Sequence, residues 1–186
     1  ERGPEAANAV NANVDISITT TSARLKIFLD IFKCLLLILK NKRKIKHVRR
    51  EDRKKYTDML TSLKNRNYLN LNIEKWNNDK VYPQTVIVID LNNMKYINDN
   101  YGREKGDMII VRAASILVNS QLENSEIMRT DGNEFLIYLV GYSEKQVDTY
   151  CKKLTKEFKD LPHGFGAAIG YSIISDDIKT IDDAIN

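Results

Sequence analysis

The hydrophobic residues between positions 23 and 56 repeat at the spacing of an α-helix. Leu25, Phe28, Phe32 and Leu35 lie three and four residues apart, as in the seam of a coiled coil. The apolar run continues past this seam, but charged residues interrupt it, and it is too short to span a bilayer. The pattern therefore predicts an amphipathic linker helix over residues 23–56.

Residues 57–186 alternate between helical and strand-like patterns. The segment 85–91 is rich in Val and Ile without polar alternation, which indicates a strand buried on both faces. Two apolar runs around a short polar turn predict a β-hairpin over 126–141. We expect the rest to form helices at 68–76, 104–120, 143–158 and 178–185, a polar turn at 92–102 and a strand at 164–174. This order favours an α+β domain, a mixed β-sheet flanked by helices.

The stretch from Lys40 to Lys55 is strongly basic and contains only two acids, Glu51 and Asp52. One interpretation is the solvated continuation of a helix that packs on a partner helix. A second is a helix at the inner membrane surface, with its cations facing anionic lipid. A nucleic-acid site is the third, but aromatic interleaving, zinc-ligand spacing and a recognition-helix pattern are all absent. We therefore expect no nucleic-acid partner.

Composition narrows the class of protein. The chain has 186 residues, of which 42% are hydrophobic and 29% charged, with a net charge of +4, as in ordinary globular domains.

Cys34 and Cys151 match neither a disulfide framework nor metal-ligand spacing, so we expect a reducing compartment. Residues 1–22 do not read as a signal peptide and predict a weakly ordered segment. Because the chain starts at Glu1 rather than Met, we expect it to be part of a longer protein. We also expect a cytoplasmic location, in which a missing upstream segment would be a route of attachment to the inner face of the membrane.

Acids at the ends of predicted strands suggest a metal-nucleotide site. Asp90 closes the buried strand, and the hairpin turn carries Gly132, Asn133 and Glu134. Mg²⁺ prefers oxygen ligands, usually one or two carboxylates together with substrate phosphates. An acid at a strand end more often caps the next loop, so Asp90 alone does not establish such a site.

Three polar residues downstream have both a structural and a functional interpretation. Lys95 is either solvated or a counter-charge for phosphate. Asn98 and Asp107 are either turn and helix-start residues or a pair that recognises a base, since a carboxylate accepts two N–H groups such as those on the edge of guanine.

Four motifs, in order, resemble those of the GGDEF domain of the diguanylate cyclase family. They are Asp58-x-Leu60-Thr61-x-Leu63-x-Asn65-Arg66; Val88-Ile89-Asp90-Leu91-Asn92-x-x-Lys95-x-Ile97-Asn98-Asp99-x-Tyr101-Gly102-x-x-x-Gly106-Asp107; Arg129-x-Asp131-Gly132-Asn133-Glu134-Phe135; and Ala168-Ile169-Gly170-Tyr171-Ser172. Four motifs at family spacing are far more specific than one short match. The resemblance covers residues 57–186, without the family's closing C-terminal segment.

The resemblance implies a nucleotidyl-cyclase-like fold in which two facing domains each hold one GTP. Each 3′-hydroxyl attacks the partner's α-phosphate to give cyclic di-GMP, and Mg²⁺ offsets the developing charge. By this resemblance, Asp90 and the Leu91 carbonyl would bind the metal. The amides of Asn93 and Met94 and the ammonium group of Lys95 would contact phosphate, and Asn98 and Asp107 would recognise guanine. Gly132 would let the backbone approach the nucleotide closely.

The signature departs from the family pattern at two places. Asp131 replaces the first glycine, and Asn133 replaces the acid that serves as metal ligand and base. Asparagine coordinates only weakly through its carbonyl and takes up no proton. Glu134 remains as an acid, so the candidate catalytic residues are Glu134, Asn133 and Lys95. The product-inhibition motif is also absent, since its positions are Leu122 and Ser125.

Three hypotheses follow. The first is a degenerate domain that binds GTP or a related guanine nucleotide for regulation, with a weakened Mg²⁺ site and little or no cyclase activity. The second is an active diguanylate cyclase rescued by Glu134 or water, and the third is a membrane-proximal dimerisation module. Because such domains work in pairs, we predict a homodimer through Leu25, Phe28, Phe32 and Leu35.

Overall fold

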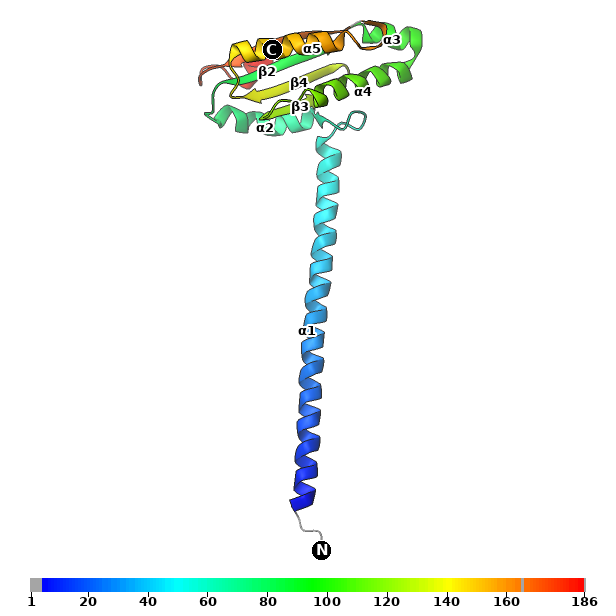
Figure 1. Cartoon of the computed structure of the whole chain (residues 1–186), viewed down its shortest axis with the longest axis vertical. Coiled ribbons are helices and arrows are strands. Elements are labelled where there is room, and N and C mark those ends of the chain that lie inside the picture. The colour runs from blue at the N-terminus through cyan, green and yellow to red at the C-terminus, as the bar shows by residue number, and fades with distance from the viewer. Residues whose placement is uncertain (1–4, 165, 186) are drawn as a thin grey trace. The chain divides into compact units, whose positions relative to one another are not determined.

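The computed structural model describes residues 5–164 and 166–185, with side chains given for Lys26, Leu29 and, apart from Arg49 and His163, from Phe32 onward. The chain divides into two units, Glu1–Glu51 and Asp52–Asn186, each with its own internal contacts. The described residues of the first unit belong to one long helix, α1, which runs from Glu5 to Tyr56 (Figure 1).

Helix α1 confirms the predicted N-terminal helix. Phe32 and Leu35, two of the four predicted seam residues, are 49% and 51% exposed in the single chain. The side chains of Leu25 and Phe28 lie outside the described residues. The helix shows no break near residue 22, and the weak order expected for residues 1–22 stays a prediction. None of the described helices combines the length and the hydrophobicity that a membrane span requires.

The second unit is built on a mixed five-stranded sheet in the order β1-β3-β4-β2-β5. Its strands are β1 (Lys64–Asn65), β2 (Gln84–Leu91), β3 (Ser125–Arg129), β4 (Glu134–Val140) and β5 (Ala167–Ile174). β1 pairs parallel with β3, and the other pairs are antiparallel. β2 lies between β4 and β5, so the buried strand predicted from the Val and Ile run is an inner strand of the sheet.

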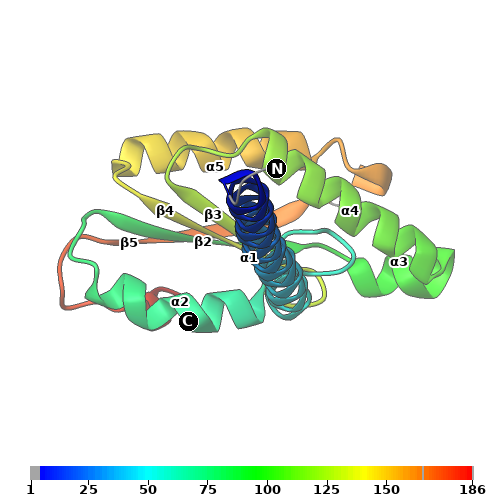
Figure 2. The same cartoon turned by 90° about the horizontal axis from the view of Figure 1, so that it is seen from below.

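Helices cover both faces of this sheet (Figure 2). One face carries α3 (Met94–Tyr101), α4 (Arg103–Asn119) and α5 (Glu144–Phe158), and the other carries α2 (Arg66–Asn78) and α6 (Ile181–Ile185). On β2, Ile87 and Ile89 belong to the first core and Val86 to the second, and all three are fully buried. Burial on both faces explains why this strand has no polar alternation.

The predicted polar turn over 92–102 is wrong, because most of this segment forms α3. Only Met94 and Ile97 of this helix are buried, so its hydrophobic repeat covers less than two turns and is too short to recognise. Asn93 precedes the helix with a φ of 57°, a left-handed conformation that asparagine tolerates better than most residues. The two-residue strand β1 was also not predicted.

Candidate functional site

Pairing of β2 with β4 brings Asp90 to the hairpin tip. Asp90 lies directly opposite Glu134 in the antiparallel register, although 43 residues separate Asp90 from Asn133. The Leu91 amide donates a 3.0 Å hydrogen bond to the carbonyl of Asn133, the residue directly before the start of β4. The two acidic segments that the sequence suggested as a site therefore meet at one edge of the sheet.

Asn133 is hydrogen-bonded to both groups expected to hold the metal. Its Nδ2 lies 2.5 Å from Asp90 Oδ1 and 3.1 Å from the Leu91 carbonyl oxygen. Both partners are acceptors, so the side-chain atom facing them must be the amide nitrogen rather than the amide oxygen. A donor group thus occupies the space between the carboxylate and the carbonyl.

This arrangement does not fit Mg²⁺. The ion requires oxygen ligands in near-octahedral order, whereas Asn133 directs N–H groups at the Asp90 carboxylate and the Leu91 carbonyl. Turning the amide over would offer a neutral oxygen and lose both hydrogen bonds. In the part of the chain that the structure describes, no three His, Cys, Asp or Glu side chains gather as a metal site.

Glu134, the remaining acid, is held inside the hairpin. Its carboxylate accepts a hydrogen bond from the Thr130 hydroxyl, and its carbonyl accepts one of 3.1 Å from the Thr130 amide. Thr130 is buried and Glu134 is half-buried. Glu134 therefore closes the turn, a structural role that its position in the signature did not indicate.

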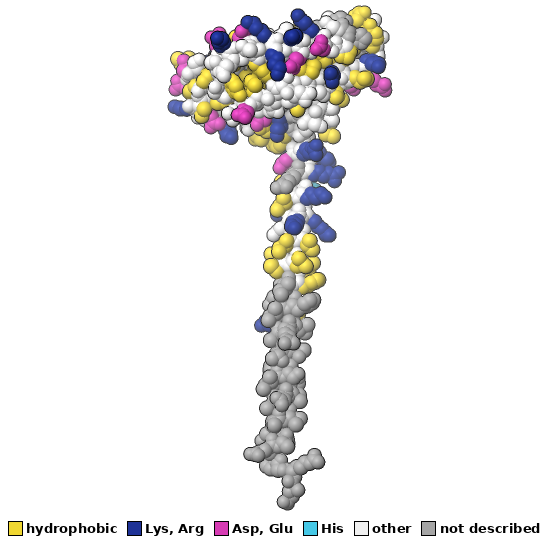
Figure 3. Space-filling model, in the orientation of Figure 1, with side chains coloured by type: hydrophobic (Ala, Val, Ile, Leu, Met, Phe, Trp, Pro, Cys, Tyr) yellow, Lys and Arg dark blue, Asp and Glu magenta, His cyan; other side chains and the backbone are white. Residues whose placement is uncertain are grey.

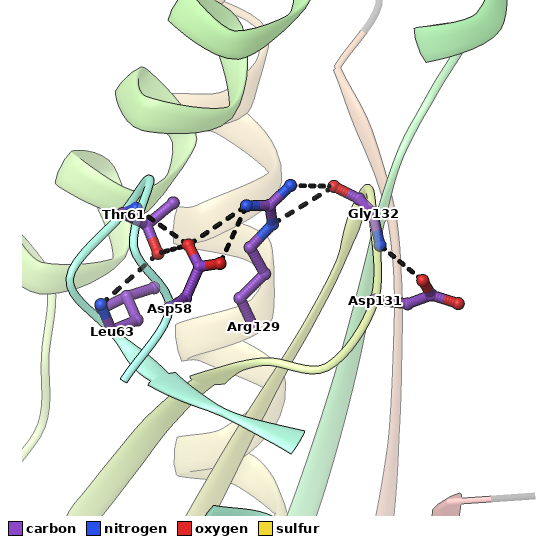
Figure 4. Close-up of polar contacts among 6 residues, drawn as sticks. All are labelled: Asp58, Thr61, Leu63, Arg129, Asp131 and Gly132. Atoms are coloured by element: carbon purple, nitrogen blue, oxygen red, sulfur yellow. Dashed lines mark hydrogen bonds and ion pairs between the residues drawn. The ribbon is translucent and has the colours of Figure 1, made fainter. Parts of the chain in front are cut away.

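Arg129 links the hairpin tip to the turn that follows α1 (Figure 4). Its Nη2 and Nε donate to the Gly132 carbonyl at 2.7 and 3.2 Å, and its Nη1 lies 3.1 Å from both carboxylate oxygens of Asp58. Asp58 also accepts hydrogen bonds from the amide and hydroxyl of Thr61. Burial raises the pKa of Asp58, but the bonds from Thr61 and the charge of Arg129 outweigh it, so the pKa of this carboxyl is below its usual value.

Hydrogen bonds from Asn65 and Asn67 hold the C-terminal end of α1. The side-chain amides of Asn65 and Asn67 both donate to the Lys55 carbonyl, at 2.9 and 3.1 Å, and so satisfy an orphan acceptor of the helix end. In the sequence, Asp58, Asn65 and Arg129 stand out only as members of the family motifs, without a predicted role. The ion pair joins residues 71 positions apart, and only the fold reveals it.

The Asp131 side chain is hydrogen-bonded to the backbone of the hairpin turn. Its Oδ1 accepts a 2.7 Å hydrogen bond from the Gly132 amide. This amide belongs to the segment where a nucleotide was expected to approach the backbone. A Cβ built at Gly132 would meet no atom within 4 Å, so the space beside it is open. The side chain that replaces the family's first glycine therefore engages a backbone donor in this turn.

The residues expected to recognise the nucleotide lie beyond β2, on α3 and α4. Asn98 packs against Gly106, where its Oδ1 would be 2.0 Å from a Cβ built on the glycine. Asp107 follows immediately and is exposed, as is Lys95. Gly106 thus lets Asn98 reach the start of α4 next to Asp107, a packing requirement that the motif alone did not explain. Asn93 is exposed at the start of α3, whereas the Met94 side chain enters the core.

Comparison with known proteins decides the family. The family model described as "Diguanylate cyclase, GGDEF domain" matches residues 55–186 of this chain. The chain belongs to the GGDEF diguanylate cyclase family. The resemblance inferred from the four motifs and the expected cyclase-like fold are confirmed, and the domain is one of cyclic di-GMP signalling.

Relatives of this GGDEF domain include enzymes of opposite activities. It is 31% identical over 124 residues to the cyclic di-GMP phosphodiesterase PdeR of Escherichia coli K12, covering 64% of this chain and 18% of PdeR. It is 31% identical over 122 residues to the diguanylate cyclase DgcN of the same organism, covering 62% of this chain and 30% of DgcN. The chain thus spans only a minor part of these relatives.

Among solved structures, the coiled coil and GGDEF domain of DgcB from Caulobacter crescentus, in complex with c-di-GMP, is similar in fold. The TM-score is 0.70 at 18% identity, and the match covers 79% of this chain and 85% of the chain in that structure. The described part of the chain thus has the helix and mixed sheet expected for this family.

Proposed function

We propose that this GGDEF domain is a regulatory member of cyclic di-GMP signalling that binds GTP or a related guanine nucleotide and makes little or no cyclic di-GMP. The observation that carries the proposal is the side-chain amide of Asn133, which donates to Asp90 and to the Leu91 carbonyl. The Asp90 carboxylate and the Leu91 carbonyl, which would hold a metal in an active cyclase, here accept hydrogen bonds from this amide.

Loss of the acid removes two chemical functions at once. Asn133 supplies no negative charge for a divalent ion and accepts no proton from an attacking hydroxyl. Removal of a general base typically costs about 10²–10⁴ in rate. Glu134 does not replace it in this arrangement, because its carboxylate is already hydrogen-bonded to Thr130.

The groups proposed to bind nucleotide are retained. Asp107 is an exposed carboxylate that can accept two N–H groups, and Asn98 beside it offers both a donor and acceptors. Lys95 and the amides of Asn93 and Met94 supply positive charge and N–H donors for phosphate at the N-terminus of α3. Binding and turnover therefore depend on different residues.

Two measurements on the full chain test this proposal. Calorimetry is expected to detect GTP binding that is stronger than ATP binding, and Asp107→Asn is expected to remove the preference. Asp148→Asn, on the exposed outer surface of α5, is the matched control and should leave the preference for GTP unchanged.

In a turnover assay with GTP and Mg²⁺, little cyclic di-GMP should form. Efficient turnover that Asp90→Ala abolishes would instead establish an active cyclase.

We also propose that two copies pair through α1, with Phe32 and Leu35 in the contact. Both side chains are about half exposed in the single chain, and a heptad seam buries such residues in pairs. Light scattering is expected to give a dimer mass that Phe32→Glu with Leu35→Glu converts to a monomer. A wild-type monomer at high micromolar concentration would refute the pairing.

A further inference from the structure

Five consecutive apolar residues encircle α1. Leu35, Leu36, Leu37, Ile38 and Leu39 are each between 47% and 60% exposed in the first unit, which comprises Glu1–Glu51. Successive residues of an α-helix are separated by about 100°, so five of them cover its whole circumference. A helix that is apolar all round is normally covered on every side.

Pairing with a second copy covers only one side of this apolar band, Leu35–Leu39. The predicted seam ends at Leu35, and its spacing of three and four residues continues to Leu39. It leaves Leu36, Leu37 and Ile38 on the remaining sides of the helix. A two-stranded coiled coil buries a single stripe, so these three residues need another apolar contact.

Charge identifies the nature of that contact. Ten of the sixteen residues from Lys40 to Lys55 are Lys or Arg. Figure 3 shows the apolar band on α1 and the dark blue cations directly after it. Continuing the seam spacing from Leu39 leads to Lys42 and Lys46, so a second copy would place like charges together along this stretch.

An anionic lipid surface matches both parts. Interfacial helices bury apolar side chains about 5–10 Å deep, at the boundary between headgroups and acyl chains, which would cover the apolar band. Lipid phosphates then lie at the level of the adjoining cations. A nucleic acid would match the charge but leave the apolar band uncovered.

We propose that α1 docks the protein on an anionic bilayer, with the apolar band at the acyl boundary and Lys40–Lys55 among the headgroups. The contact is interfacial and independent of nucleotide binding. It brings the GGDEF domain to a membrane surface without requiring a helix that spans it.

The test is sedimentation of the full chain with vesicles of phosphatidylcholine, alone or mixed with phosphatidylglycerol. Binding to the anionic vesicles, weakened by salt, is expected. Each charge removed in the series Lys42→Gln, Arg43→Gln and Lys44→Gln should weaken it by about fivefold. The matched control is the series Lys152→Gln, Lys153→Gln and Lys156→Gln on exposed α5 positions, which leaves binding unchanged.

The apolar band is tested separately by Leu36→Gln, Leu37→Gln and Ile38→Gln combined, which keep good helix formers in place. Binding should fall at least about tenfold. A polarity-sensitive dye on Cys34 reports insertion, because Cys34 is exposed next to the band while Cys151 is buried.

A blue shift of this dye with anionic vesicles supports docking. Two results would each overturn the proposal: equal binding to neutral vesicles, or an unshifted dye. A third would be vesicle binding that the combined Leu36, Leu37 and Ile38 variant leaves unchanged and that single-stranded DNA matches. The last result would identify a general polyanion site instead.

Discussion

The hairpin tip and the α3–α4 corner flank the same strand end, yet their polar groups are in opposite states. At the tip, Asp90 and Asn133 bind each other, and Glu134 binds Thr130. At the corner, the Asp107 and Lys95 side chains are exposed. Under the proposed function, phosphoryl transfer would depend on the first region and recognition of the base on the second. A change in one region would then remove one capability and keep the other.

The largest expected effect comes from restoring the acid. Asn133→Asp replaces an N–H donor with a second carboxylate beside Asp90, so Mg²⁺ affinity measured by calorimetry should rise by at least about tenfold. Without metal, the two like charges should lower the melting temperature, and Mg²⁺ should restore it. Asn100→Asp adds the same charge on exposed α3 and serves as the control. An unchanged Mg²⁺ affinity would show that position 133 does not contact the metal.

Removing the Arg129 side chain should loosen the hairpin tip. Arg129→Ala deletes the bonds to Gly132 and to Asp58, whose side chain is only 22% exposed, and leaves that carboxylate without its partner. The free energy of unfolding by urea should fall by about 1–3 kcal/mol. Lys152→Ala breaks the exposed pair with Asp148 and should leave the free energy of unfolding nearly unchanged. Equal costs for the two variants would contradict a special role for the Arg129 contact.

The same contact predicts a dependence on pH. The folded-state pKa of Asp58 lies below its ordinary value of 3.8, because the bonds from Thr61 and the charge of Arg129 outweigh the opposing effect of burial. Its contribution to stability is thus complete above the unfolded-state pKa and is lost as pH falls through the lower, folded-state value. The stability gap between the wild type and Asp58→Asn should be constant near neutrality and close in acid below pH 3.8. A gap that persists at the lowest pH would mean that the carboxylate charge is not responsible.

The smallest change in stability, but a specific one, is expected at the α3–α4 corner. In Gly106→Ala the new Cβ would fall 2.0 Å from Asn98 Oδ1, so the Asn98 side chain must swing away. Alanine gains up to about 1 kcal/mol of helix propensity over glycine, which offsets much of the cost. GTP affinity should fall severalfold while the melting temperature changes little. Unchanged affinity would remove Asn98 from the nucleotide site.

Much of the fold was predictable because the strongest patterns are local. The Val and Ile run gave β2, the apolar pairs around a polar turn gave the hairpin, and Ser143 marked the start of α5, where Gln146 completes a capping box. Helix α3 was missed because it buries only two side chains, too few for a repeat. Ordered motifs also identified the family, since their residues keep fixed spacing along the chain.

The sequence by itself determined which residue types are available at the site and that position 133 carries no charge. Tertiary structure alone decided what those residues do. The register of β2 on β4 places the Asn133 amide against Asp90, and the packing of the turn after α1 brings Asp58 to Arg129. Hydrogen bonds depend on distances between atoms far apart in the chain, and no local pattern encodes those distances. The result is a hairpin tip where Asn133 donates to Asp90 and Thr130 donates to Glu134, while Asp107 and Lys95 on α4 and α3 stay exposed.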